Sequence, residues 1–304
     1  MPHDLDQALK GISGILVTPY DDAGDLAPAR LVPIIDRAIT AGVHMPVVNG
    51  NTGEFYALTT EEACTMAQEV AGMIAGRAPM LAGIGRGIRD ACRLARVSAD
   101  AGASALMIHQ PPDPFVSPRG TVDYIKAIAQ ASGGLPMMLY LRNDAIGTQA
   151  IADLCAVPGV KGVKWATPNP LKLAEAIAAC DPGITWVGGL AEVWAPPLYA
   201  VGARGFTSGL INVWPERSVA IHAALDAGDY PAANALIADM RAFEDIRAEE
   251  LNGTNVTGVK AALQALGLDC GATRPPSAWP LDDSQQAKLG AFLTANGLKA
   301  RDPA

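Results

Sequence analysis

The chain has 304 residues, of which 50% are hydrophobic and 5% aromatic, and its formal net charge is −8. This length can bury one large core, as a single barrel domain or as two ordinary domains. The negative charge argues against nucleic acid or an anionic membrane as a partner, because both need a basic surface. No apolar run is long enough to cross a bilayer, and the five cysteines form no CxxC pair, which is typical of a reducing compartment. We therefore expect a soluble, cytoplasmic protein.

Short apolar runs alternate with longer, Ala-rich amphipathic stretches along the first three quarters of the chain. The short runs predict eight strands, at residues 12–20, 45–50, 79–85, 105–111, 136–142, 160–166, 185–191 and 205–211. The amphipathic stretches predict a helix after each strand, at residues 28–41, 60–75, 89–101, 118–131, 148–155, 170–179, 193–201 and 215–227.

Eight strand–helix pairs, spaced about 25 residues apart, match the TIM (β/α)8 barrel. The alternative is a doubly wound open sheet, which usually has fewer units and a glycine fingerprint after its first strand. Here the first strand runs into Asp21-Asp22 without that fingerprint, so we favour the barrel. Three further helices are predicted at residues 230–250, 257–266 and 284–296. We interpret residues 1–227 as the barrel and residues 228–304 as a C-terminal helical extension of the same domain.

The predicted sixth strand carries two lysines in an apolar run. In a βα barrel the reacting groups lie at the C-terminal ends of the strands. Lys161 stands near the start of this strand and Lys164 near its end, and a separation of three places them on opposite faces. If Lys164 points inward, desolvation lowers its pKa from about 10.4 and supplies the free amine that attacks a carbonyl. A salt-bridged or snorkelling lysine is the alternative.

The predicted fifth and second strands end in further candidate groups. Tyr140 and Arg142 have the same parity in the fifth strand, where a phenol can shuttle protons and a guanidinium can clamp a carboxylate. The alternative is a tyrosine that caps the core and an arginine that pairs with Asp144. After the second strand, a Gly-rich turn carries Asn51 and Thr52, which can donate to a carboxylate or take part in a proton relay. Alone, this segment is a polar turn.

In order and spacing, three motifs resemble the dihydrodipicolinate synthase / N-acetylneuraminate lyase family: Asn51-Thr52-Gly53-Glu54, Tyr140 and Gly162-Val163-Lys164. The similarity runs through nearly the whole chain. The resemblance implies class I aldolases and dehydratases on a βα barrel with a C-terminal helical extension, assembled as a dimer or tetramer. It makes Lys164 the Schiff-base lysine, Tyr140 the proton-transfer tyrosine, and Thr52 part of the relay. Thr52, with Asn51 in place of the family's usual first threonine, also belongs to the pocket for the keto-acid carboxylate, and Gly53 is a further substrate-binding candidate there.

The chain departs from the lysine-pathway synthases of that family after two strands. Residues 109–115 replace a Tyr-Tyr-Asn-Arg-Pro stretch, so the tyrosine that a neighbouring subunit would lend is missing. Residues 144–147 replace Ser-Arg-x-Gly and remove the arginine that would hold an aldehyde's carboxylate. Arg142 is then the candidate for binding a carboxylate. The stretches more similar to the branch that dehydrates 5-keto-4-deoxyglucarate are residues 140–144, 206–215 and 274–276.

Other strand ends carry open candidates. Gly189, Ser208 and Gly209 close the last two strands, where many barrels bind phosphate; we favour the alternative that the glycines make room for a sugar chain. His109 is either a general acid or base or a hydrogen-bonded structural histidine, and Asp113 in the loop after it is a further candidate. No metal site is expected, because the histidines lack ligand spacing and the strand ends lack a carboxylate cluster.

These residues predict a Schiff-base-forming lyase that acts on a small 2-keto acid, with no cofactor beyond the imine on Lys164. The first choice is dehydration of a keto-deoxy sugar acid such as 5-dehydro-4-deoxyglucarate. A pyruvate-dependent aldolase, including 4-hydroxy-tetrahydrodipicolinate synthase, is the alternative within the same chemistry. From other classes, the alternatives are a non-catalytic barrel that binds a keto acid and a phosphosugar-binding barrel. The sequence leaves the direction of flux open.

Overall fold

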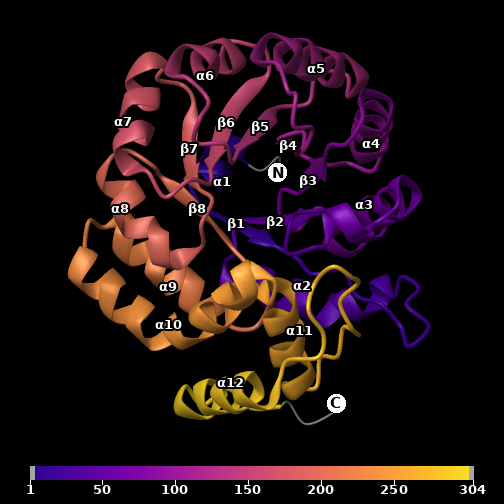
Figure 1. Ribbon diagram of the computed structural model, residues 1–304, viewed down its shortest axis with the longest axis vertical. Coiled ribbons are helices and arrows are strands. Elements are labelled where there is room, and N and C mark those ends of the chain that lie inside the picture. The colour runs from indigo at the N-terminus through magenta and orange to yellow at the C-terminus, as the bar shows by residue number, and fades with distance from the viewer. Residues whose placement is uncertain (1–3, 301–304) are drawn as a thin grey trace.

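A closed barrel of eight parallel strands forms the centre of the protein, whose computed structural model describes residues 4–300 (Figure 1). Each strand pairs with the next one along the chain, and β8 pairs with β1 to close the barrel. The strands are β1 Ile12–Ile15, β2 Met45–Val48, β3 Leu81–Ile84, β4 Ala105–His109, β5 Met137–Leu141, β6 Val160–Trp165, β7 Thr185–Gly188 and β8 Gly205–Ser208. The predicted TIM barrel is confirmed, and the open-sheet alternative was wrong.

Helices surround the strands and follow the predicted order. They are α2 Val32–Ala41, α3 Thr60–Ile74, α4 Ile88–Asp100, α5 Pro118–Ala131, α6 Thr148–Cys155, α7 Pro170–Ala179, α8 Ala195–Ala200 and α9 Pro215–Asp226. Most begin at a capping side chain or at a proline in the first turn: Thr59 and Glu62 form a capping box at α3, and Pro118 opens α5 after the Ser117 cap. No helix among the described residues is long and apolar enough to span a membrane.

The predicted strands extend beyond the observed ones at their C-terminal ends. The strand expected at residues 12–20 ends at Ile15, and the one expected at residues 205–211 ends at Ser208. Most of the residues just beyond these ends, such as Leu16, Val17 and Ile211, are still apolar and buried. Leu210–Asn212, for example, turns into a short 3-10 helix. The apolar character of these buried loop residues therefore made the predicted strands too long.

Inward-facing side chains fill the barrel as a packed core that includes Met45, Met107, Met138 and Val187. Helix α1 (Leu5–Leu9) contacts β1 and β7 and adds Leu9 to this core, so it covers the N-terminal ends of the strands. The opposite, C-terminal ends of the strands carry the loops that form the candidate site.

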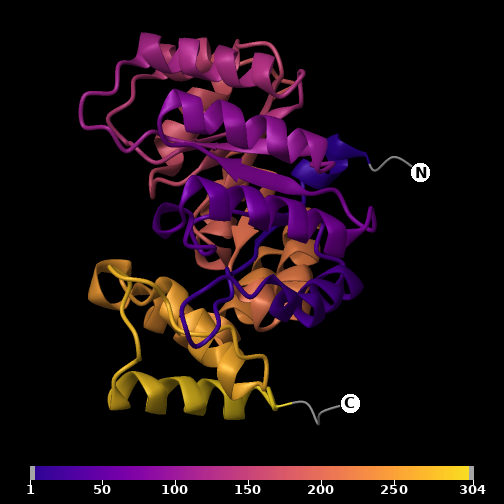
Figure 2. The ribbon, with the colours of Figure 1, turned by 90° about the vertical axis from the view of Figure 1, so that its right-hand side faces the viewer.

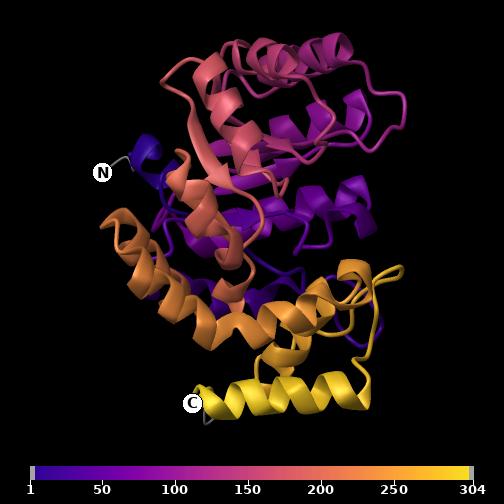
Figure 3. The same cartoon turned by 60° about the vertical axis from the view of Figure 1, so that its left-hand side comes forward.

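Three further helices form a layer on one side of the barrel: α10 Tyr230–Asn252, α11 Asn255–Ala265 and α12 Asp283–Ala295. Helix α10 packs against α9, α11 and α12, and α12 lies outermost (Figures 2 and 3). The boundary at residues 227/228 stays a prediction, and the ends of the two predicted ranges, residues 1–3 and 301–304, lie outside the described residues. We call residues 228–300 the extension.

Candidate active site

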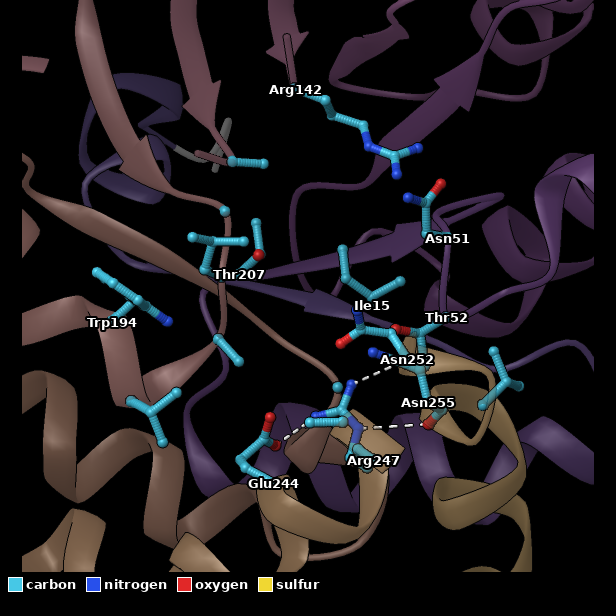
Figure 4. Close-up of a pocket in the computed structure, with 18 of the residues that line it drawn as sticks. Ile15, Asn51, Thr52, Arg142, Trp194, Thr207, Glu244, Arg247, Asn252 and Asn255 are labelled. Carbon is cyan, nitrogen blue, oxygen red and sulfur yellow. Dashed lines mark hydrogen bonds and ion pairs between the residues drawn. The ribbon is translucent and has the colours of Figure 1, made fainter. Parts of the chain in front are cut away.

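A cavity of about 750 Å³ opens at the C-terminal ends of the strands, between the barrel and the extension. Side chains from the strand ends and their loops line one side of it, and side chains from α10 and α11 line the other (Figure 4). Lys164, Tyr140, Thr52, Asn51, Arg142, Gly189 and Gly209, all predicted site residues, lie on its lining. The fold thus brings together residues that are distant in the sequence.

Lys164 lies inside the barrel, whereas Lys161 is exposed. The two lysines therefore lie on opposite faces of the strand, as expected. Only 3% of Lys164 is exposed, and its Nζ lies 3.9 Å from the centre of the Tyr140 ring. Burial, and then the positive charge of Arg142, lowers the pKa of Lys164 to about 7. A large fraction of this amine is therefore uncharged near neutral pH, the state needed for attack on a carbonyl.

Tyr140 stands beside Lys164 because the two residues are paired across β5 and β6. Burial raises the pKa of the Tyr140 hydroxyl to about 12, so the phenol keeps its proton at neutral pH. Asn51 Nδ2 donates a 2.9 Å hydrogen bond to the Tyr140 hydroxyl oxygen. Within residues 4–300, that hydroxyl makes no second hydrogen bond, so its own proton can be given to a ligand.

Thr52, which the resemblance makes part of the proton relay, does not hydrogen-bond to Tyr140 in the structure of residues 4–300. Thr52 lines the cavity, but the hydrogen bond to Tyr140 comes from Asn51, whose side chain is longer and ends in an amide donor. Asn51 therefore orients the phenol in this structure, and the part of Thr52 in the relay stays a prediction. The place of Thr52 on the lining is compatible with direct contact to a ligand.

A buried ion pair holds the turn that carries Asn51 and Thr52 against the extension. Glu54 ends this turn in the left-handed region at φ 55°, and its Oε1 lies 2.7 Å from Lys260 Nζ of α11. Both side chains are almost fully buried, at 2% and 0% exposed. The second oxygen of Glu54 accepts from the Arg274 backbone N–H at 2.8 Å. The extension thereby fixes the position of a barrel loop.

Arg142 has no carboxylate within 4 Å among the described residues. The expected alternative partner, Asp144, instead lies 4.0 Å from Lys172. Burial raises the pKa of the nearby Tyr56, and the positive charge of Arg142 opposes this rise. In Figure 4 the guanidinium points into the cavity toward Asn51. A cation without a carboxylate partner on a cavity wall is suited to an anionic ligand.

Three predicted substrate contacts, His109, Gly53 and Ser208, do not line the cavity. His109 is buried, stacks on Phe55 at 4.3 Å and hydrogen-bonds to the Asn49 carbonyl at 2.8 Å. Burial lowers its pKa to about 3, so the ring is neutral and its position is that of a structural histidine. The Gly53 carbonyl accepts a hydrogen bond from the Thr18 hydroxyl.

Ser208 points into the protein behind the cavity. Its hydroxyl donates to Glu192 Oε1 at 2.5 Å, and Ser218 donates to the same oxygen. Burial, and then the charge of Glu244, raises the pKa of Glu192 to about 7. A serine already bound to a buried carboxyl group is poorly placed to bind phosphate. Asp113 lies in the exposed loop after β4 and beside a second hollow, away from Lys164.

The sequence did not single out the lining residues contributed by the extension. Arg247, Asn255 and Asn252 all face the cavity (Figure 4). The one local signal was Glu244, three residues before Arg247, which is a spacing that favours an ion pair on a helix. Such pairs are common on solvent-exposed helix faces, so the signal alone does not indicate a site.

Comparison with known proteins assigns the chain to a family. Residues 8–296 match the Dihydrodipicolinate synthetase family. The chain belongs to this family. The 4-hydroxy-tetrahydrodipicolinate synthase of Maridesulfovibrio salexigens is 31% identical to this chain over 295 residues, which cover 95% of this chain and 99% of that one. A probable 5-dehydro-4-deoxyglucarate dehydratase of Streptomyces avermitilis is also 31% identical over 295 residues, covering 93% and 94% of the two chains.

The fold agrees with this assignment to the Dihydrodipicolinate synthetase family. Crystal structures of dihydrodipicolinate synthases from Oceanobacillus iheyensis and Bacillus clausii both superpose with a TM-score of 0.92. The first is 34% identical and covers 96% of this chain and 98% of that chain; the second is 33% identical and covers 97% and 100%. The predicted family and the prediction of a lyase are confirmed. Among residues 4–300, no three His, Cys, Asp or Glu side chains are grouped so that they could hold a metal ion.

Proposed function

We propose that this lyase forms an imine between Lys164 and a small 2-keto acid and dehydrates a keto-deoxy sugar acid, such as 5-dehydro-4-deoxyglucarate. One observation carries the proposal: a lysine buried in the barrel, with a pKa near 7, lies against a tyrosine that keeps its proton. Binding alone does not require an amine nucleophile, so this pair argues against a non-catalytic barrel. We expect a homo-oligomer, as the resemblance to the family implies.

The reaction begins with attack of the Lys164 amine on the C2 carbonyl. The Tyr140 hydroxyl, held by Asn51, gives its proton to the departing C2 oxygen, which leaves as water, and a protonated imine remains. The C3 proton then moves to the Tyr140 phenolate, and the electron pair of the C3–H bond forms an enamine. The enamine expels the C4 hydroxyl, which leaves as water with a proton from Tyr140. Hydrolysis of the protonated imine by water releases the keto acid and the Lys164 amine, and the proton set free returns to the Tyr140 phenolate.

The choice of dehydration rests on the groups around the lysine. Arg142 presents a cation for a carboxylate, and relatives of similar identity include a probable 5-dehydro-4-deoxyglucarate dehydratase. Aldol addition by the same enamine is the second candidate, because equally similar relatives are 4-hydroxy-tetrahydrodipicolinate synthases. A phosphosugar site near Ser208 is disfavoured, because the Ser208 hydroxyl already donates its hydrogen bond to the Glu192 carboxyl group.

A turnover assay tests the proposed function. The protein is mixed with a six-carbon 3-deoxy-2-keto acid that carries a C4 hydroxyl, and the products are followed by mass spectrometry. We expect a keto acid that has lost water, and we expect Lys164→Ala to reduce the rate to background, because the variant has no amine nucleophile. Lys161→Ala, on the same strand but exposed, should keep the parent rate. Consumption of pyruvate with an aldehyde, and no reaction of the sugar acid, would favour the aldolase instead.

A further inference from the structure

The extension supplies a second, polar side to the cavity. The residues of α10 and α11 that form it, here called the extension wall, include Arg241, Glu244, Asp245, Arg247, Asn252 and Asn255. None of them takes part in the imine chemistry proposed above. A three-carbon keto acid bound to Lys164 would leave most of a 750 Å³ cavity to water, which takes ~30 Å³ per molecule. The wall therefore faces space that a longer substrate chain would enter.

Arg247 is the most buried charged group on this wall, with 4% of its surface exposed. Its guanidinium forms an ion pair with Glu244 and donates to Asn255 Oδ1 at 3.0 Å and to the Asn255 carbonyl at 3.3 Å. A guanidinium has five N–H donors, so two remain after these three bonds. In Figure 4 the group stands on the cavity side of α10, between Glu244 and Asn255.

Gly209, just after β8, leaves the space that Arg247 occupies. A Cβ atom at this position would lie 2.5 Å from Arg247 Nη2 and 3.0 Å from Cζ. Real Cβ atoms do not come so close to other heavy atoms, so any larger residue would displace the guanidinium. The barrel strand and the extension helix are therefore fitted to each other at this point, and Arg247 is held in one position on the cavity lining.

The backbone that presents Asn252 is held in an unfavourable conformation. Glu250, Leu251 and Asn252 all have positive φ, between 51° and 68°, a left-handed conformation that L residues other than Asn and Asp rarely adopt. The Thr254 hydroxyl stabilises the turn by donating to the Ile246 and Glu249 carbonyls. Strain of this kind persists where the surroundings impose it, and it is frequent at ligand sites.

The charges on the extension wall are balanced. Arg247 pairs with Glu244, and Arg241 pairs with Asp245 at 3.0 Å. A carboxylate would therefore meet as many negative as positive groups here, whereas Arg142, across the cavity, has no carboxylate partner among the described residues. Paired Arg and Glu side chains with Asn amides offer both donors and acceptors. Hydroxyl groups need both at once.

We propose that Arg247, together with Asn255 and Glu244, forms a subsite for the hydroxyl groups of a long 2-keto acid and so determines specificity for a polyhydroxy chain. This subsite rests on the proposed function, because Lys164 anchors the keto end of the same molecule. Arg247 donates its remaining N–H groups to hydroxyl oxygens, and the Glu244 carboxylate and the Asn255 amide oxygen accept from the hydroxyl protons. A keto acid without hydroxyls gains nothing at this wall.

The test compares three keto acids on matched variants. Pyruvate, 2-oxohexanoate and a six-carbon 3-deoxy-2-keto acid with hydroxyls on C4 to C6 are trapped on the protein with borohydride, and the half-saturating concentration is measured for each. The variants are Arg247→Met, which removes the guanidinium, and Gly209→Ala, which displaces the guanidinium but keeps both charged side chains. The double variant Arg247→Met/Glu244→Gln leaves no unpaired buried charge. Arg217→Met is the control, because Arg217 also pairs with a carboxylate and packs on a ring, outside this cavity.

We expect the half-saturating concentration of the hydroxylated acid to rise about ten- to a hundred-fold in all three variants, the range for lost hydrogen bonds to a charged donor. The values for pyruvate and 2-oxohexanoate should stay unchanged, and the control should behave like the parent. An equal rise for all three acids, or no rise for the hydroxylated one, would overturn the subsite. If the parent traps no acid at all, the proposed imine is what fails. In that case calorimetry tests the subsite: the parent is expected to bind the hydroxylated acid more tightly than the variants do, and equal affinities would overturn the subsite.

Discussion

Replacement of Tyr140 with phenylalanine is expected to lower kcat for the keto acid by about 10²- to 10⁴-fold, the range for loss of a general acid–base group. The hydroxyl that gives and takes protons at C2, C3 and C4 disappears, while the ring that packs against Lys164 stays. KM should change far less than kcat, because the phenol acts on the reacting atoms and not on the distant end of the chain. Steady-state kinetics with the sugar acid measures both parameters.

The matched control for this substitution is Tyr124→Phe. Tyr124 also loses a single hydrogen bond, from its hydroxyl to the Arg86 carbonyl at 3.0 Å, but it lies on α5 away from Lys164. We expect parent kinetics for this control. If Tyr140→Phe and Tyr124→Phe have the same kcat, the phenol has no part in proton transfer.

Replacement of Lys260 with methionine is expected to lower the free energy of unfolding by about 3–5 kcal/mol, the range for removal of one partner of a buried ion pair. Lys260 has no exposed surface, and its loss leaves the Glu54 carboxylate buried with the Arg274 N–H as its remaining partner. Methionine keeps most of the apolar stem, so the lost free energy of unfolding comes from removal of the charge and not from a new cavity. Denaturant unfolding measures the difference.

The double variant Glu54→Gln/Lys260→Met should recover most of this loss, because it leaves no unpaired charge in the core. Lys288→Met is the control, since Lys288 forms an ion pair with Glu249 on an exposed surface and should change stability much less. Equal losses in Lys260→Met and Lys288→Met would show that the buried pair does not hold the extension to the barrel loop.

The barrel could be predicted because its pattern is local and repeats eight times. Each strand is a short apolar run, and helices such as Pro118–Ala131 and Pro170–Ala179 begin and end at the predicted residues. Strand ends were less predictable, since buried loop residues such as Leu210 have the same apolar character as the strand. Strand position and parity made Lys164 and Tyr140 candidates, but their assignment as a pair came from the resemblance to the family.

The extension's part in the site could not be predicted, because it depends on contacts between distant segments. Lys260 and Arg247 look like ordinary charged residues on amphipathic helices, yet the first pairs with Glu54 in the core and the second contacts Gly209. The sequence could place Asn51 in the site, but it could not predict the hydrogen bond from Asn51 to Tyr140. That bond depends on how the turn after β2 lies relative to β5. The role of His109 was left open for a related reason. Its structural role follows from two contacts: the Phe55 ring stacks on it, and the Asn49 carbonyl accepts its hydrogen bond.

The most direct measurement is the pH dependence of borohydride trapping with pyruvate, followed by mass mapping of the labelled peptide. The folded-state pKa of Lys164 is about 7, so the fraction of free amine rises as the pH rises through 7. The initial rate of labelling should therefore rise with a midpoint near pH 7, and the added mass should lie on the peptide that contains Lys164. A label on another lysine, no label at all, or a rate that rises only near the pKa of an ordinary lysine, about 10.4, would contradict the account.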